Sequence, residues 1–99
     1  MATVTLNAKE MLTLSLFSGW TEFVVHGETM ETALQNYQVL RGVLSEFEFM
    51  EVPADINYKA VTGMRKCIGP YKEYLMAVGD VDELKAVSNL MKRLTQNFQ

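Results

Sequence analysis

Residues 30–47, METALQNYQVLRGVLSEF, and residues 81–98, VDELKAVSNLMKRLTQNF, carry apolar side chains at alternating steps of three and four. A helix places residues three and four apart on one face, so each stretch predicts an amphipathic helix. Such a face must be buried against another helix, within one chain or between copies. The first stripe consists of Met30, Ala33, Tyr37, Leu40, Leu44 and Phe47, and the second of Leu84, Val87, Met91, Leu94 and Phe98.

The size and composition of the chain indicate one globular domain. Its 99 residues suffice for one modest core, and a hydrophobic fraction of 48% with 21% charged residues is typical of a folded protein. No apolar run approaches the roughly 20 residues that span a bilayer, and the N-terminus lacks the pattern of a signal peptide. A single cysteine cannot form an internal disulfide. We expect a cytoplasmic protein with one domain, residues 1–99, and no membrane partner.

Charge is divided unevenly between the two parts of the sequence. Residues 1–56 contain eight acids and two bases, a net charge of −6, whereas residues 57–99 contain seven bases and four acids, a net charge of +3. Opposite charges of this kind can pair the two halves of one fold, or the acidic face of one copy with the basic face of another. The alternative is that two solvated faces merely differ in composition. Extended nucleic acid is not expected as a partner, because the sequence pI is near 5.0.

A capping signal marks the start of the first predicted helix. Asn7 can cap a helix while Glu10, three residues later, reaches back to the cap amide, which is the capping-box arrangement. The helix is predicted to start at Ala8 and to end near Ser18. The segment Trp20–His26 is rich in β-branched and aromatic residues, so it is read either as a strand or as a continuation of the helix.

The middle of the chain is expected to contain the first amphipathic helix and then an extended segment. The helix runs from residue 30 to about residue 47, and the alternation in Glu46–Phe49 favours a short extended piece after it. Pro53 is expected to close that piece, because a residue before proline is driven out of helical geometry. Asp55–Asn57 then resembles a turn followed by a helix cap.

The second half of the sequence is expected to contain three helices. One helix is predicted through Ile68, followed by a break at Gly69–Pro70 and a short helix from Pro70 to Val78, because proline is tolerated in a first turn and disruptive in an interior. At the next boundary Gly79 can end one helix, Asp80 can cap the next, and Glu83 can complete a second capping box.

The last helix is predicted over residues 81–97. Together these elements predict a mainly α fold, a compact bundle of four to five helices in a single helical domain. One or two short β-strands are expected near the N-terminus, where Thr3–Leu6 is β-prone, or around residue 49.

Catalytic and metal-binding signals are weak throughout the sequence. His26 has no second histidine with which to build a zinc site, and Cys67 is read as a small apolar filler despite its basic neighbours. Glu46, Glu48 and Glu51 lack the glycine and the ligand spacing of a calcium loop. We therefore predict that the protein is not an enzyme, and we expect neither a metal nor a cofactor.

The segment 58–74 is the one stretch whose residue types suit the binding of a small ligand. Its bases could attract the negative charge of a metabolite or nucleotide, and its tyrosines could stack on a base. The alternative is that the tyrosines anchor the core and the bases are solvated. The candidate ligand-binding residues are Lys59, Arg65, Lys66, Tyr71, Lys72 and Tyr74.

The leading functional hypothesis is a non-catalytic protein-interaction module, such as a small adaptor, inhibitor or regulator. The partner is another protein or a second copy of the chain, and the character of the sequence would suit an accessory protein of a phage. Packing within one chain is the first interpretation of the apolar stripes, and self-association is the second. The candidate interface residues are those of the second stripe, Leu84, Val87, Met91, Leu94 and Phe98.

Overall fold

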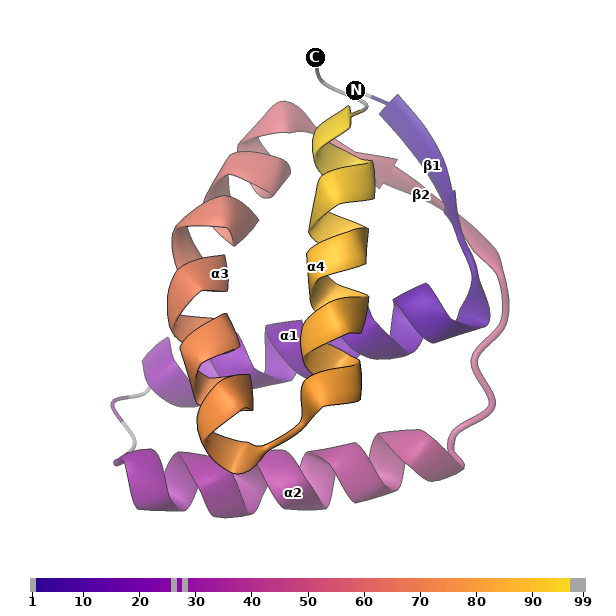
Figure 1. The fold of residues 1–99 in the computed structure, drawn as a ribbon. Helices are drawn as coiled ribbons and strands as arrows, with labels where there is room; N and C mark the ends of the chain where they lie inside the picture. The colour runs from indigo at the N-terminus through magenta and orange to yellow at the C-terminus, as the bar shows by residue number, and fades with distance from the viewer. Residues whose placement is uncertain (1, 26, 28, 97–99) are drawn as a thin grey trace.

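The computed structural model describes residues 2–25, 27 and 29–96, which form four helices and a two-stranded sheet. Two helical hairpins make up most of the molecule (Figure 1). The hairpin of α1 and α2 lies across the hairpin of α3 and α4, and the sheet flanks α4 near both chain ends. The elements are β1 (Ala2–Leu6), α1 (Ala8–Val25), α2 (Met30–Glu46), β2 (Val52–Ile56), α3 (Tyr58–Val78) and α4 (Val81–Gln96). The predicted mainly α bundle with a short strand near the N-terminus is confirmed.

The two strands form an antiparallel ribbon. Thr5 pairs with Pro53 and Leu6 with Val52 in the register of this ribbon. Each strand has only one neighbour in the sheet, so Pro53, which has no N–H to donate, is tolerated within β2. The expectation that Pro53 ends an extended piece around residue 49 is therefore wrong: it lies inside the strand, and the turn expected at residues 55–56 belongs to β2 as well.

Helix α1 begins as the sequence predicts but continues further. The Asn7 Oδ1 accepts the Glu10 backbone N–H at 2.8 Å, and Glu10 Oε1 accepts the Asn7 backbone N–H at 3.1 Å, so the capping box is confirmed. The helix does not end near residue 18. Gly19 is instead a packing position, because a Cβ atom there would clash with Leu40 Cδ2 on α2.

Helix α3 is continuous, with Pro70 in its interior, so the predicted break at Gly69–Pro70 is wrong. An interior proline removes one helical hydrogen bond and costs about 3 kcal/mol. The turn that follows Pro70 buries Tyr71, Tyr74 and Leu75, and each large side chain contributes roughly 1.5–3 kcal/mol on burial. The free energy gained by burying these three side chains after Pro70 exceeds the cost of proline inside the helix. For this reason four helices form and not five.

The boundary between α3 and α4 follows the prediction in part. Gly79 ends α3 in the left-handed conformation with φ of 80°, and Asp80 Oδ1 accepts the Glu83 backbone N–H at 3.3 Å. The second half of the capping box does not form, because the Asp80 N–H donates to the Leu75 carbonyl at 3.0 Å. The Glu83 side chain is thereby available for a buried position, where only 3% of the residue is exposed.

The interior consists of two apolar clusters. The larger one joins all four helices, and the smaller one packs the ribbon against α3 and α4. The buried members of the larger cluster are Leu16, Phe17, Trp20, Ala33, Tyr37, Tyr71, Tyr74, Leu75, Val87 and Met91. Those of the smaller cluster are Val4, Leu6, Val61, Leu90 and Leu94.

Candidate functional site

The two tyrosines expected to contact a ligand belong to the core. Tyr71 stacks on Phe17 with ring centroids 4.8 Å apart and planes 2° from parallel, and it also lies 5.1 Å from the Trp20 ring. Tyr74 packs against Trp20 at 5.7 Å and edge-on to Tyr37 at 5.4 Å. Burial raises the pKa of Tyr74 to about 12. Neither ring is accessible for stacking on a nucleotide base. The two tyrosines instead anchor the core, which was the alternative interpretation of the sequence.

The four bases of the same segment are separated by the helix that carries them. Lys59, Arg65 and Lys66 are exposed and Lys72 is half-buried. Arg65 and Lys72 line one groove between α3 and α4, whereas Lys59 and Lys66 do not line it. The groove adds a cation that the sequence interpretation did not include, Lys92 of α4. The structure therefore brings together two of the six predicted ligand residues.

A partly buried polar network joins α2 to the start of α4. The Tyr37 hydroxyl donates to Asp80 Oδ2 at 2.8 Å, and Arg41 Nε lies 3.0 Å from the same oxygen. Arg41 Nη1 also lies 3.4 Å from Glu83 Oε1. Burial, followed by the hydrogen bond to Asp80, raises the pKa of Tyr37 far above its usual range, so this hydroxyl is a donor at neutral pH and not a base. The network can orient α2 on the α3–α4 turn.

Glu83 is the carboxyl of this network whose pKa is raised. Burial raises the pKa of its carboxyl, while the neighbouring Thr13 hydroxyl and the Arg41 guanidinium act in the opposite direction. Asp80 adds to the rise and Lys9 opposes it. The spacing of Asp80 and Glu83 predicted only a capping role for Glu83, and a capping role does not indicate burial.

We expect the stability cost of ionised Glu83 to appear as pH rises. A carboxyl whose pKa is raised by folding favours the folded state below its ordinary value of 4.5, and that contribution is lost as pH rises through the folded-state pKa. The glutamine of Glu83→Gln does not titrate. The free energy of unfolding of this variant, relative to that of the original chain, should therefore increase as pH rises from about pH 4 to pH 8. Urea unfolding of both chains across this range measures the difference, and a pH-independent difference would contradict the raised pKa.

The described part of the second stripe lies inside one chain. Val87, Met91 and Leu94 are buried in the two clusters, and Leu84 is half-buried and packs against the larger cluster. Phe98 lies outside the described residues. These side chains serve packing within the chain, which was the first interpretation of the stripe, and they are not available to a second copy while the fold is intact.

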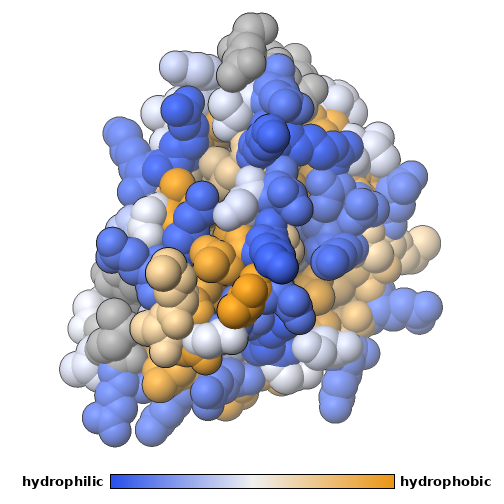
Figure 2. All heavy atoms as spheres, viewed as in Figure 1, coloured by the Kyte–Doolittle hydropathy of each residue, from blue (hydrophilic) through white to orange (hydrophobic). Residues whose placement is uncertain are grey.

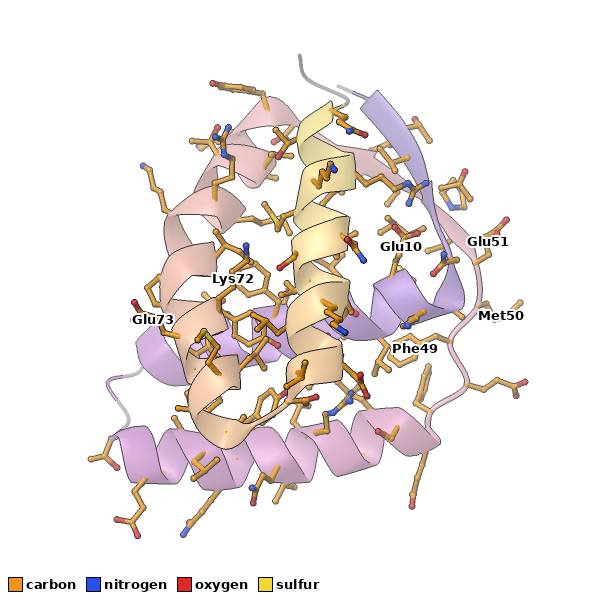
Figure 3. The ribbon with its side chains drawn as sticks, viewed as in Figure 1. Glu10, Phe49, Met50, Glu51, Lys72 and Glu73 are labelled. Carbon is orange, nitrogen blue, oxygen red and sulfur yellow. The ribbon has the colours of Figure 1, made fainter. Side chains whose placement is uncertain are left out.

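A different apolar surface is open to solvent, on the outer side of α2. Val39, Val43 and Phe47 follow one another at steps of four, and their exposed fractions are 67%, 61% and 63%. Met50, in the connection to β2, is 76% exposed. Figure 3 shows Met50 and Glu51 pointing away from the molecule and Phe49 turned toward it. We call Val39, Gly42, Val43, Phe47 and Met50 the α2 outer surface.

The α2 outer surface is unusual for its density of exposed apolar side chains. Among the described residues, seven large apolar side chains are exposed, and four of them come from residues 39–50. Single exposed apolar residues need no explanation, whereas several that share one helix face are a candidate interaction surface. Val39 and Val43 lie outside the first predicted stripe, although their spacing of four was a usable signal in the sequence.

The remaining candidates for chemistry stay isolated. Cys67 is half-buried and packs against the larger cluster, where it lines an apolar hollow between α1 and α3 with Phe17 and Met64. His26 lies outside the described residues. Within residues 2–25, 27 and 29–96, no three His, Cys, Asp or Glu side chains gather where they could hold a metal ion. In the same part of the chain, none of the helices has the length and apolar character needed to cross a membrane.

Comparisons with known proteins add no assignment. No protein-family model, curated protein or solved structure matches this chain.

Proposed function

We propose that this protein is a non-catalytic interaction module that self-associates through the α2 outer surface. The observation that supports the proposal is the run of four exposed apolar side chains over residues 39–50. Covering these side chains removes apolar area from water, which is favourable by roughly 25 cal/mol per Å². The occupant we propose is a second copy of the chain. A protein of this kind would act as an adaptor, inhibitor or regulator, and its single unpaired cysteine suits the cytoplasm.

Gly42 provides the second argument for a helix-to-helix contact at this surface. A glycine inside a helix costs about 0.5–1 kcal/mol relative to alanine. At Gly19 that cost has a reason within the chain, since Leu40 occupies the space of a side chain. At Gly42 nothing lies within 4 Å of where a Cβ atom would be, so no contact within the chain requires glycine there. Gly63 and Gly69 in α3 have equally open surroundings, so open space alone does not distinguish Gly42. What distinguishes it is its place beside the exposed Val39 and Val43, where a second backbone could approach closely.

The charges around the surface are compatible with an antiparallel pair of α2 helices. Three acids, Glu46, Glu48 and Glu51, lie at its C-terminal end and are exposed. An antiparallel pairing centred on Gly42 brings residues 46–51 of one copy near residues 33–38 of the other. That stretch contains no charged residue and presents the side chains of Gln35 and Gln38 to solvent. The acids of the two copies therefore lie at opposite ends, and Coulomb repulsion between them is limited.

The contact should be of low affinity, because one helix face buries less area than a standard interface. Stable protein pairs bury about 800 Å² on each partner, and smaller contacts belong to transient associations. A dissociation constant between about 1 μM and 1 mM corresponds to −8.2 to −4.1 kcal/mol and is the range we expect.

Gly42→Ala tests the close approach directly. The added methyl should raise the stability of the isolated chain by about 0.5–1 kcal/mol, because alanine is the better helix former. The same methyl should weaken self-association by about tenfold, because it separates the two backbones. Unfolding of dilute protein and sedimentation equilibrium of concentrated protein measure the two effects.

Gly63→Ala is the matched control, since Gly63 is an exposed glycine inside α3 with nothing within 4 Å of an added Cβ atom. It should raise stability similarly and leave association unchanged. Association of Gly42→Ala that equals that of the unmodified chain would contradict a close helix contact at this position.

A further inference from the structure

A second surface of different character lies between α3 and α4. A groove of about 560 Å³ follows these two helices. Three of its lining residues are cations and none is an acid. The residues that line it are Arg65, Ile68, Lys72, Ser88, Met91, Lys92, Thr95 and Gln96. Figure 2 shows hydrophilic side chains on both sides of apolar ones along this seam. The groove thus combines an apolar floor with positively charged walls.

The cations come from both helices and are spread along the groove. Lys72 follows Arg65 by seven residues, two turns of α3, which corresponds to about 10 Å along the helix axis. Because α3 and α4 form an antiparallel hairpin, Lys72 is level with Ser88 near one end, and Arg65 is level with Thr95 and Gln96 near the other. Lys92 reaches the groove between these two levels. The spacing fits an elongated anion better than a single phosphate.

The nearest acid on α3 does not neutralise the groove. Figure 3 shows Lys72 and Glu73 on opposite sides of α3, with Lys72 toward α4 and Glu73 away from it. The C-terminal carbonyls of α4 lie at the Arg65 end and carry partial negative charge, which offsets part of the Arg65 charge. Lys72 and Lys92 are therefore the principal contributors to the attraction of an anion.

The buried tyrosines restrict what part of a ligand can be recognised. Tyr71 and Tyr74 belong to the core, so the rings that were expected to stack on a nucleotide base are on the inner side of α3. The groove itself offers ammonium and guanidinium donors for oxyanions, and aliphatic groups of Ile68 and Met91 on its floor. Recognition should depend on linked negative charges and not on a base.

We propose that the α3–α4 groove binds a small polyanion with two or three linked phosphates, held chiefly by Lys72 and Lys92 with Arg65 at the far end. This site is separate from the α2 outer surface and goes beyond the proposed function. A bound polyanion would also relieve the mutual repulsion of three cations that line one groove.

The test uses tripolyphosphate as the probe, in isothermal titration calorimetry with dilute protein at low ionic strength. We expect saturable binding, an affinity that falls as salt is raised, and a higher melting temperature in the presence of the probe. Orthophosphate should bind at least about tenfold more weakly, because it can reach only one or two of the cations. ATP should bind about as tightly as tripolyphosphate, because no aromatic side chain among the described residues lines the groove to stack on its base. Clearly tighter binding of ATP would contradict recognition by the linked charges alone.

Two variants and one control locate the site. Lys92→Gln and Lys72→Gln should each weaken binding of tripolyphosphate by about tenfold, since each removes one charge-assisted contact. Lys66→Gln removes the same charge from an exposed position outside the groove and should leave the affinity within about twofold. Circular dichroism checks that each variant is folded. Absence of binding, or equal losses in Lys66→Gln and Lys92→Gln, would overturn the proposal.

Discussion

Tyr71→Ala is expected to lower the free energy of unfolding by about 3–5 kcal/mol, the range observed when a large buried aromatic side chain is truncated. Tyr71 is fully buried and contacts the rings of Phe17 and Trp20, so its removal leaves a cavity where α1 meets α3. A domain of this size has only about 5–15 kcal/mol of total stability. Equilibrium urea unfolding, followed by far-UV circular dichroism, measures the loss.

Tyr74→Phe is the matched control for Tyr71→Ala. The Tyr74 hydroxyl is buried without a hydrogen-bond partner of acceptable geometry, so its removal leaves no donor or acceptor unpaired. We expect this variant to be as stable as the original chain or up to about 1 kcal/mol more stable. A loss of less than about 1 kcal/mol in Tyr71→Ala would contradict the central role of the aromatic cluster.

Val43→Glu is expected to abolish self-association and to leave the fold intact. Val43 is 61% exposed in the single chain, and substitutions at exposed positions usually change stability by less than about 0.5 kcal/mol. In the proposed pair of helices the same carboxylate would be buried without a cation. Burial of an unpaired charge should weaken the association by at least about 100-fold.

Ser45→Glu is the control for added charge. Ser45 is exposed on α2 but lies outside the α2 outer surface, so it places the same charge on the same helix without entering the contact. The two variants should be equally stable in dilute solution and should differ in mass at high concentration. Equal masses for Val43→Glu and Ser45→Glu at every concentration would contradict the assignment of the contact to Val43.

Local signals in the sequence predicted the helices well where packing and capping agreed. The stripes of residues 30–47 and 81–98 correspond to α2 and α4, and the Asn7–Glu10 capping box fixes the start of α1. The errors occur where tertiary burial overrode a local preference. Gly19 is a packing position and Pro70 lies inside a helix, since contacts with Leu40 and burial of Tyr71 outweigh the local cost.

The candidate sites were less predictable because they depend on how helices are placed. The sequence grouped Arg65 and Lys72 with two tyrosines of the same segment, but the helix turns those tyrosines to the core and the bases to the groove. Lys92 joins the bases only because α4 folds back along α3. The α2 outer surface emerges only once the inner face of α2 is known, since spacing alone cannot say which of two apolar faces is covered.

The interface expected on α4 changes for the same physical reason. The second stripe and the α2 outer surface both contain apolar residues at helical spacing, which in α2 are Val39, Val43 and Phe47. Val87, Met91 and Leu94 are covered by the rest of the chain, whereas Val39, Val43 and Phe47 remain largely exposed, with the Phe47 ring in contact only with Phe49 among the described aromatic rings. Self-association therefore moves, as a proposal, from α4 to α2.

The mass of the unmodified chain in solution, measured by sedimentation equilibrium over a wide concentration range, tests the central claim most directly. We predict that the average mass rises from 11.2 kDa toward twice that value as concentration increases, and that Val43→Glu stays at 11.2 kDa throughout. A mass of 11.2 kDa for the unmodified chain at concentrations up to about 1 mM would contradict self-association through the α2 outer surface.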